Sequence, residues 1–483
     1  MSAPTLRGPV LASLAGKAVE AVTLVLLATL VPRLLGPADY GGFAVALTVV
    51  ALGSLAMTMG GATLLARYVP TAADPAGVAA ALTRRLARNR AAVFAGLVLV
   101  GAAASAAGWL PPVQTALVLA ALGCNVVATL ALQADLGLGR ALTWSFRYPL
   151  QNLVLVAGVL LLHGHFGATG AVVAILVAGA VAAVLAVAVA APLWGATAPI
   201  PDGALRFGVL QAAGGVLAQA TQRGGVLAVA VLAGSAVETG YAGLAVGIAL
   251  AATYAVVQVF TVTLPVLAGR RALGARARPG GAADGGNLGA PDAHMRAGGT
   301  RDGRPVAGTD ASDAHMRDRI AHTEDVDAHM RDRNAHHAEL TLRRIAGWLL
   351  AGVLAGALAA VPALPVAVPA VFGAAYAAAV PAFVPALAAV VLAPVNALAI
   401  QSAALRLRPD ATVRGALAGF VAFVVVALCA VPGGGAAGAT TAALVGAGVS
   451  AFVSMRLLPG AVGARIAILS FGGAAAVVLL GVL

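Results

Sequence analysis

Apolar runs of about 20 residues recur along most of this chain, and they limit what it can fold into. A helix of that length crosses the roughly 30 Å hydrocarbon core of a bilayer. Charged residues make up only 10% of the chain, against about 25% in a soluble domain. We therefore expect an all-α polytopic membrane protein with about 12–13 transmembrane helices. The predicted spans are 9–31, 41–66, 91–110, 113–137, 144–162, 167–191, 205–232, 240–267, 345–368, 376–404, 412–431, 437–457 and 463–483.

The basic residues gather on one side of this predicted topology. If the N-terminus is cytoplasmic, all but three of the 30 basic residues fall on the cytoplasmic side, the exceptions being Lys17, Arg33 and Arg223. Such a bias follows the positive-inside rule. The net charge of +12 is therefore explained by topology, and we expect no nucleic-acid partner. Anionic membrane lipids are the expected partners of a cytoplasmic arginine cluster, formed by Arg67, Arg84, Arg85, Arg88 and Arg90.

A polar segment at 268–344 interrupts the apolar pattern. The sequence DAHMR occurs in it three times, at 292–296, 313–317 and 327–331. Because the segment is rich in Gly and Asp and has no apolar heptad seam, we predict a largely disordered cytoplasmic insertion. Ala-His pairs recur in it every seven residues. That spacing would put the histidines on one face for metal ligation if the segment became helical; drift of a low-complexity repeat is the competing explanation.

The connector RLLGPADYGGF, at residues 33–43, has a faint copy, LAGSAVETGYA, at 232–242. Gly36 aligns with Gly234, 198 residues away, and six predicted spans separate the two. Since six is an even number, both copies run the same way through the membrane, which predicts two parallel six-helix lobes. Each connector would be the outer turn of a helix hairpin. The expected lobes are 1–203 and 204–457, the second containing the insertion, and an extra transmembrane helix follows at 458–483.

Several of these stretches resemble bacterial polysaccharide-biosynthesis membrane proteins, the Wzx-type oligosaccharide flippases. RLLGPADYGGFAVAL is similar to the signature after their first helix, and TQRGGVLAVAVLAGSAVETGYAGLAV to their seventh and eighth helices. VFGAAYAAAVPAF resembles the turn between their ninth and tenth helices, and RYVP fits after the second. The family belongs to the multidrug/oligosaccharidyl-lipid/polysaccharide exporter (MOP) superfamily. The resemblance implies two lobes around a central cavity that opens alternately to each side, and a polyprenyl-diphosphate-linked sugar as cargo.

Charged residues near the middle of predicted spans are the first candidates for function. Each costs about 2.5–3.5 kcal/mol to insert, so each should face a polar cavity or a partner. Lys17 and Glu20 are three residues apart and share a helical face, so they form either a local ion pair or part of the cavity lining. Arg223 has no acid within one helical turn. Its guanidinium would either grip a phosphate through two parallel hydrogen bonds or pair with Glu20 across the lobes.

Glutamines accompany Arg223 on the seventh predicted span. Gln211, Gln219 and Gln222 fall roughly on one side of that helix, where they would bond either sugars or neighbouring helices. Members of the resembled family often have an acid where this chain has Gln222, which puts a charge-pair mechanism there in doubt. Tyr148, Gln151, Asn152, Tyr254 and Gln258 are weaker candidates, because packing explains them as well.

The residues argue for a transporter. The sequence has no pairing of a nucleophile with a base, no metal-ligand cluster and no phosphate-binding Gly-Lys-Ser/Thr motif, so we expect no enzyme activity, cofactor or metal. The favoured function is a flippase in the bacterial cytoplasmic (inner) membrane that moves a lipid-linked oligosaccharide to the outer leaflet for cell-surface polysaccharide synthesis. Other polysaccharide-assembly proteins are further expected partners. The alternatives are a multidrug or cation antiporter of the same superfamily and a non-transporting scaffold of a glycan-assembly complex.

Overall fold

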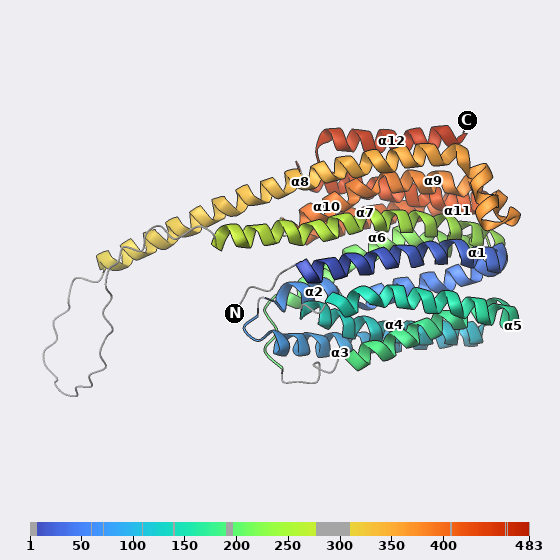
Figure 1. Ribbon diagram of the computed structural model, residues 1–483, viewed down its shortest axis with the longest axis horizontal. Helices are drawn as coiled ribbons and strands as arrows, with labels where there is room; N and C mark the ends of the chain where they lie inside the picture. The colour runs from blue at the N-terminus through green and yellow to red at the C-terminus, as the bar shows by residue number, and fades with distance from the viewer. Residues whose placement is uncertain are drawn as a thin grey trace. The chain divides into compact units, whose positions relative to one another are not determined.

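The computed structural model describes residues 7–58, 60–70, 72–108, 110–138, 141–189, 197–276, 310–405, 408–458, 460 and 462–482. Every regular element among them is helical (Figure 1). The elements are α1 (Arg7–Thr58), α2 (Gly61–Tyr68), α3 (Pro75–Ala106), α4 (Pro112–Gly137), α5 (Ala141–Val189), α6 (Ala204–Leu232), α7 (Ala236–Arg276), α8 (Asp310–Phe372), the short 3-10 helix η2 (Ala374–Ala379), α9 (Val380–Val391), α10 (Ala393–Leu405), α11 (Pro409–Leu457) and α12 (Ala464–Val482).

The predicted membrane spans are found in these helices. Within the described residues, ten helical segments are long and apolar enough to cross a bilayer. Three of them, in α1, α5 and α11, have 37, 44 and 48 residues, about twice the length that one crossing needs. Each contains a glycine with non-helical dihedral angles: Gly36 (φ 70°), Gly167 (φ 55°) and Gly435 (φ 49°). Counting these three as pairs of crossings gives the thirteen spans that the sequence predicts.

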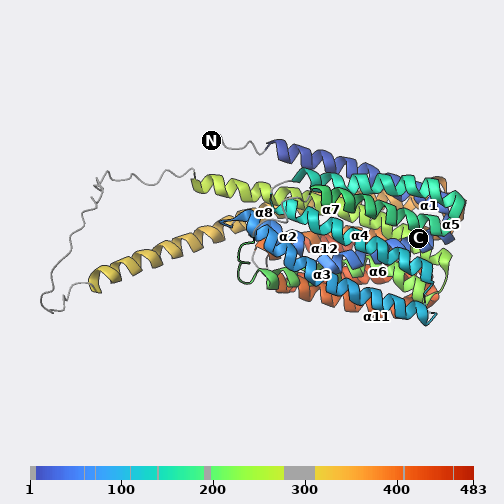
Figure 2. The same ribbon diagram turned by 90° about the horizontal axis from the view of Figure 1, so that it is seen from below.

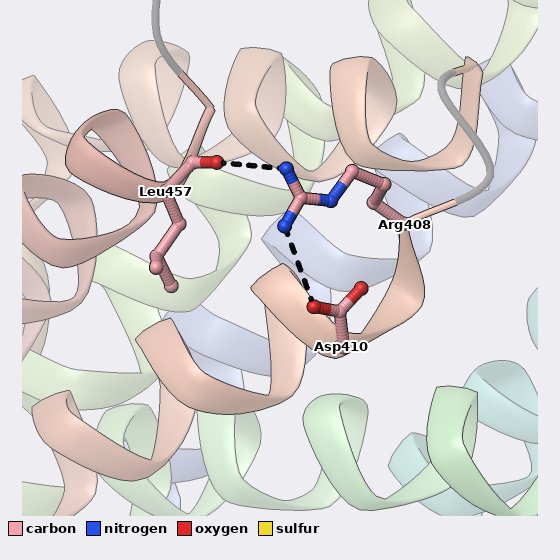
Figure 3. Close-up of polar contacts among 3 residues, drawn as sticks. All are labelled: Arg408, Asp410 and Leu457. Atoms are coloured by element: carbon pink, nitrogen blue, oxygen red, sulfur yellow. Dashed lines mark hydrogen bonds and ion pairs between the residues drawn. The ribbon is translucent and has the colours of Figure 1, made fainter.

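Helix α11 shows that such a glycine reverses the chain. Arg408 lies at the beginning of α11 and Leu457 is its last residue. The Arg408 Nη1 nevertheless donates to the Leu457 carbonyl at 3.5 Å, while its Nη2 lies 3.6 Å from an Asp410 carboxylate oxygen (Figure 3). A straight helix of this length would separate the two ends by about 70 Å. The turn at Gly435 therefore makes α11 a hairpin whose ends are joined by Arg408.

The helices pack as two sets, which we call the N-terminal set (α1–α5) and the C-terminal set (α6–α12). In the N-terminal set α5 packs mainly on α1 and α4. In the C-terminal set α6 packs mainly on α11, and α9 packs on both α11 and α12. The two sets occupy different sides of the molecule in Figure 1, and the view from below in Figure 2 brings the N-terminal set to the front. Contacts of α6 with α1 and α2 join the sets.

The two connectors meet where the sets join. Gly36 and Gly234 both have a positive φ, 70° and 64°, so the aligned glycines make the same break in each half. The backbones of the two connectors then approach each other so closely that no side chain fits between them. A Cβ on Gly41 would overlap the Ala236 carbonyl oxygen, and a Cβ on Gly240 would overlap the Pro37 carbonyl oxygen. We call this contact the connector seam; it requires glycine at positions 41 and 240.

An aromatic cluster covers the connector seam. The ring of Tyr376, from η2, lies 6.5 Å from the Tyr40 ring and 6.0 Å from the Tyr241 ring, both in edge-on geometry. The Tyr376 hydroxyl donates to the Pro32 carbonyl at 3.0 Å, and the Tyr241 hydroxyl donates to the Ala375 carbonyl at 2.9 Å. Tyrosine hydroxyls therefore hold carbonyls of the N-terminal set and of η2 at this end of the helices.

The insertion contains more helix than we expected. Residues 259–344 form a separate compact unit, in which α7 continues to Arg276 and α8 begins at Asp310. The helical part at 310–344 departs from the predicted disorder, while 277–309 lies outside the described residues. DAHMR places Asp and Arg four residues apart, a spacing that supports a helix. The side chains of 310–338 are also outside the described residues, so metal ligation by the histidines stays a prediction.

Replacing Gly240 by alanine is expected to destabilise the connector seam. The added methyl group would overlap the Pro37 carbonyl oxygen, and overpacking of this kind costs about 1–3 kcal/mol. Gly42→Ala is the matched control, because nothing lies within 4 Å of its added Cβ. Thermal unfolding in detergent should show a lower midpoint for Gly240→Ala than for Gly42→Ala; equal midpoints would contradict this packing.

Candidate functional site

Glu20 of α1 is held by a residue of the C-terminal set. Its carboxylate accepts a hydrogen bond of 2.8 Å from the Tyr254 hydroxyl of α7. The side chain of Gln258, one turn further along α7, lies beside Tyr254. Glu20 is buried, with 4% of its surface exposed. A buried carboxylate needs such donors because it has lost its water.

The Glu20 turn of α1 is also tied to α5. The Thr23 hydroxyl donates to the Glu20 carbonyl at 2.9 Å, and the Asn152 side-chain amide donates to the Thr23 hydroxyl at 3.1 Å. Tyr148, one turn before Asn152 on α5, lies close enough to both Tyr254 and Arg223 for electrostatic interaction. Polar groups of α1, α5, α6 and α7 therefore meet between the two sets, and we call this group the central polar cluster.

Arg223 enters this cluster from α6 together with two glutamines. Its Nε donates to the Gln219 Oε1 at 3.0 Å, and the Gln219 Nε2 donates to the Gln222 Oε1 at 3.3 Å. All three side chains are half-buried. Among the described residues Arg223 makes no ion pair, and the predicted pairing with Glu20 is not formed in this state; Tyr254 occupies that carboxylate instead.

Two other predicted site residues lie apart from these contacts. Gln211 is half-buried on α6, two turns or about 12 Å before Gln219. No side-chain hydrogen bond of Gln211 is formed with another described residue. Lys17 lies on α1 one turn before Glu20, but its side chain is outside the described residues. Its pairing with Glu20 and its role in a cavity both remain predictions.

A cavity opens within the C-terminal set beside Gln222. Its empty volume, counted to the open mouth, is about 680 Å³. Most of its lining comes from Ala, Val, Leu and Ile side chains of α7, α9, α10 and α11. Its polar lining residues are Gln222, Thr253, Asn396 and Thr440, with no charged residue among them. Gln222 thus borders an apolar cavity, while its neighbour Arg223 belongs to the central polar cluster.

The structure corrects the position of one arginine. Arg90 was expected at the cytoplasmic membrane surface, but it is only 1% exposed, and Arg147, expected on the cytoplasmic side, is also buried at 7%. Helices α3 and α5 begin before the spans predicted from hydropathy, and both arginines point into the N-terminal set. Arg147 Nη2 donates to the Asn125 side-chain oxygen at 3.3 Å, and Gln151 Nε2 donates to the same oxygen at 2.9 Å. Asn125 gave no signal in the sequence that separates it from a packing residue.

Solved structures with the same fold are transporters of the MOP superfamily. A lipid II flippase MurJ in an inward closed conformation matches with a TM-score of 0.60 at 7% identity, covering 97% of this chain and 96% of that one. An inward-facing multidrug resistance MATE family transporter matches with a TM-score of 0.55 at 15% identity, covering 95% and 98%. A MOP superfamily transporter from Pyrococcus furiosus, described as having a binding pocket of reverse polarity, gives 0.53 at 13% identity, covering 95% of each chain.

These likenesses establish the fold. They agree with the predicted architecture of two parallel lobes in a multi-pass membrane protein, which is the fold that flippases and multidrug transporters share. No protein-family model matches the sequence. No curated protein matches it either.

Tyr254→Phe is expected to weaken the link between Glu20 and α7. A hydrogen bond to a charged group contributes about 1.5–3 kcal/mol, and this one is 2.8 Å long and buried at its acceptor. A double-mutant cycle of Tyr254→Phe with Glu20→Gln, followed by thermal unfolding in detergent, should give a coupling energy of about 1 kcal/mol or more.

Tyr40→Phe serves as the control for that cycle. Its hydroxyl makes no hydrogen bond with the described residues, although its ring packs in the connector seam. Paired with Glu20→Gln it should show no coupling. A coupling energy near zero for Tyr254 as well would mean that the hydrogen bond between Tyr254 and Glu20 does not contribute to stability.

Proposed function

We propose that this protein is a flippase for polyprenyl-diphosphate-linked oligosaccharides, which moves them from the cytoplasmic to the outer leaflet for cell-surface polysaccharide synthesis. The fold supports transport between the sides of a membrane, and MurJ, a lipid II flippase, shares it. The proposal for a diphosphate cargo rests on Arg223, a half-buried cation that makes no ion pair with a described residue.

Arg223 provides a cation where an anionic head group would pass. It lies in the second half of α6, inside a predicted membrane span, and makes no ion pair with a described residue. Gln219 takes one N–H of its guanidinium and fixes its direction. A guanidinium carries five N–H donors, so four remain that can bind phosphate oxygens. Such a charge is costly in hydrocarbon and is usually retained for function.

The remaining polar residues receive complementary roles. In this proposal Lys17 adds a second positive charge near Arg223, and Glu20 tunes Lys17 or couples transport to a cation. The amides of Gln211, Gln219 and Gln222 bond sugar hydroxyls along α6. The lipid tail stays in the bilayer while the head group crosses between the two helix sets, and the predicted cytoplasmic N-terminus sets the direction.

A multidrug antiporter is the second candidate, and the apolar cavity favours it. Multidrug transporters of the MATE family share the fold with a TM-score of 0.55, and a hydrophobic drug suits a cavity lined by Ala, Val and Leu. A site for cationic drugs should be acidic, however. The central polar cluster instead has Arg223 from one set and Glu20, already bonded to Tyr254, from the other.

Arg223→Gln is expected to cause a lipid-linked oligosaccharide to accumulate on the cytoplasmic leaflet. Loss of charge-assisted hydrogen bonds worth about 1.5–3 kcal/mol would slow transport by about ten- to hundredfold. The measurement is a mass-spectrometric profile of polyprenyl-diphosphate glycans in cells that carry only the variant. Arg206→Gln is the matched control, because Arg206 is on the same helix but exposed.

The two functions give different outcomes in this experiment. A single complete lipid-linked oligosaccharide that accumulates in Arg223→Gln, but not in Arg206→Gln, identifies the cargo. A glycan profile that does not change even when the gene is deleted would exclude the flippase. Loss of resistance to cationic drugs in the same deletion strain would then favour the antiporter.

A further inference from the structure

Two helix ends meet inside the N-terminal set at the break between α1 and α2. Helix α1 ends at Thr58, and α2 begins at Gly61 after Gly60, which has a φ of 67°. The first turn of α2 has no side-chain cap. The unpaired amides at a helix N-terminus carry partial positive charge and bind anions readily.

Arg90 adds a full positive charge at this break. It comes from α3, and only 1% of its surface is exposed. Its Nη2 uses both hydrogens, donating to the Thr58 carbonyl at 3.0 Å and to the Gln133 side-chain oxygen at 2.7 Å. Its Nε and Nη1 are buried and have no hydrogen-bond partner among the described residues. The guanidinium thus keeps three unpartnered N–H groups in the interior.

The Nη2 of the guanidinium, which bonds Thr58 and Gln133, lies beside the first residue of α2. A Cβ on Gly61 would stand 2.9 Å from the Arg90 Nη2 and would overlap the Gln133 side-chain oxygen. No carboxylate among the described residues pairs with Arg90. Burial removes water from its guanidinium, and no described charge of the opposite sign compensates for that loss. A buried cation without a counter-ion is unfavourable by itself. The hydrogen bond to the Thr58 carbonyl gives a structural role to one nitrogen of the guanidinium. It gives no reason for burying the other two nitrogens without acceptors in the described part of the chain.

We infer that the α1–α2 break is a second anion site, in which Arg90 and the first amides of α2 bind a phosphoryl group. The inference rests on the proposed function in one respect, namely that the cargo supplies the phosphoryl group. Discontinuous membrane helices place their amide ends toward anionic substrate groups in this way.

The site is reached when the two helix sets separate. Gly60 packs against α6, where a Cβ on it would overlap the Gly208 carbonyl oxygen. In this state the contact closes the break. Gly208 lies on the same helix as Gln211, Gln219 and Arg223, at the end where α6 begins. A phosphoryl group released from the α1–α2 break would therefore pass along the polar residues of α6 toward Arg223.

Hydrogen–deuterium exchange of the purified full-length protein in detergent tests this inference. The probes are inorganic pyrophosphate and farnesyl diphosphate, added separately. Each bound probe should slow exchange of the amides in the first turn of α2. For amides that exchange only while the probe is not bound, binding slows exchange by a factor of 1 + [L]/Kd, which is about 100-fold at a probe concentration of 100 Kd. Protection by both probes shows that the diphosphate group is sufficient, and protection by farnesyl diphosphate alone shows a lipid-borne ligand; protection by pyrophosphate alone shows a soluble anion. All three support the site.

Matched variants separate this site from a purely structural role of Arg90. Arg90→Gln should abolish protection of α2, while Arg88→Gln, which removes an exposed charge two residues away on the same helix, should preserve it. If Arg90→Gln does not fold, Gly61→Ala gives the test, because it keeps the charge and fills the space beside it. Protection that persists in Arg90→Gln, or in Gly61→Ala, would overturn the inference.

The experiment also separates this inference from the proposed function. Arg223→Gln should keep the protection of α2 even where it stops transport. If neither probe protects α2 in the wild-type protein while Arg223→Gln still accumulates cargo, the second site is wrong and the flippase stands. If α2 is protected but deletion leaves the glycan profile unchanged, the anion site stands and the flippase is wrong.

Discussion

Backbone groups at helix breaks need partners inside this protein, because hydrocarbon offers them none. Straight membrane helices satisfy their own N–H and C=O groups, but this chain reverses or breaks its helices repeatedly at glycines with positive φ. Side chains distant in sequence supply partners at several of these points. They are Arg90 on the Thr58 carbonyl, Tyr376 on the Pro32 carbonyl, Tyr241 on the Ala375 carbonyl and Glu238 on the Ala436 amide. These four side chains thereby have a structural reason to lie near the breaks.

That requirement also explains how the two helix sets are joined. The aligned glycines Gly36 and Gly234 make equivalent breaks, and each connector then packs its backbone on the other. Near the other end of α6, Gly60 approaches Gly208 in the same manner. Between these two backbone contacts lie Glu20 and Tyr254, which are joined by a hydrogen bond, and Arg223, which bonds Gln219 on its own helix. Glycine contacts release their partners without breaking side-chain bonds, as the proposed transport cycle would require.

The sequence predicted much of this fold because its strongest signals are local. Hydropathy located the spans, and the paired connectors predicted the breaks at Gly36 and Gly234. Burial within a helix set is not local, and this is where prediction was wrong. Arg90 resembled its neighbours Arg84, Arg85 and Arg88 in the sequence, but it alone turns inward to cap Thr58. Likewise the hydrogen bond between Tyr254 and Glu20 joins residues 234 positions apart, and nothing in the sequence links the two. Most residues of the central polar cluster could be named from the sequence, although Thr23 was not, and the connections among them could not be predicted.

Translocation by the purified protein in proteoliposomes tests the central claim most directly. A polyprenyl-diphosphate glycan with a fluorescent label on its sugar would be placed in both leaflets, and an impermeant quencher would report which labels remain protected inside. The account predicts that vesicles with this protein lose the protected fraction within the assay, while protein-free vesicles keep it. If the protected fraction persists, and the same vesicles instead accumulate or expel a cationic drug, the protein transports drugs and the proposed cargo is wrong.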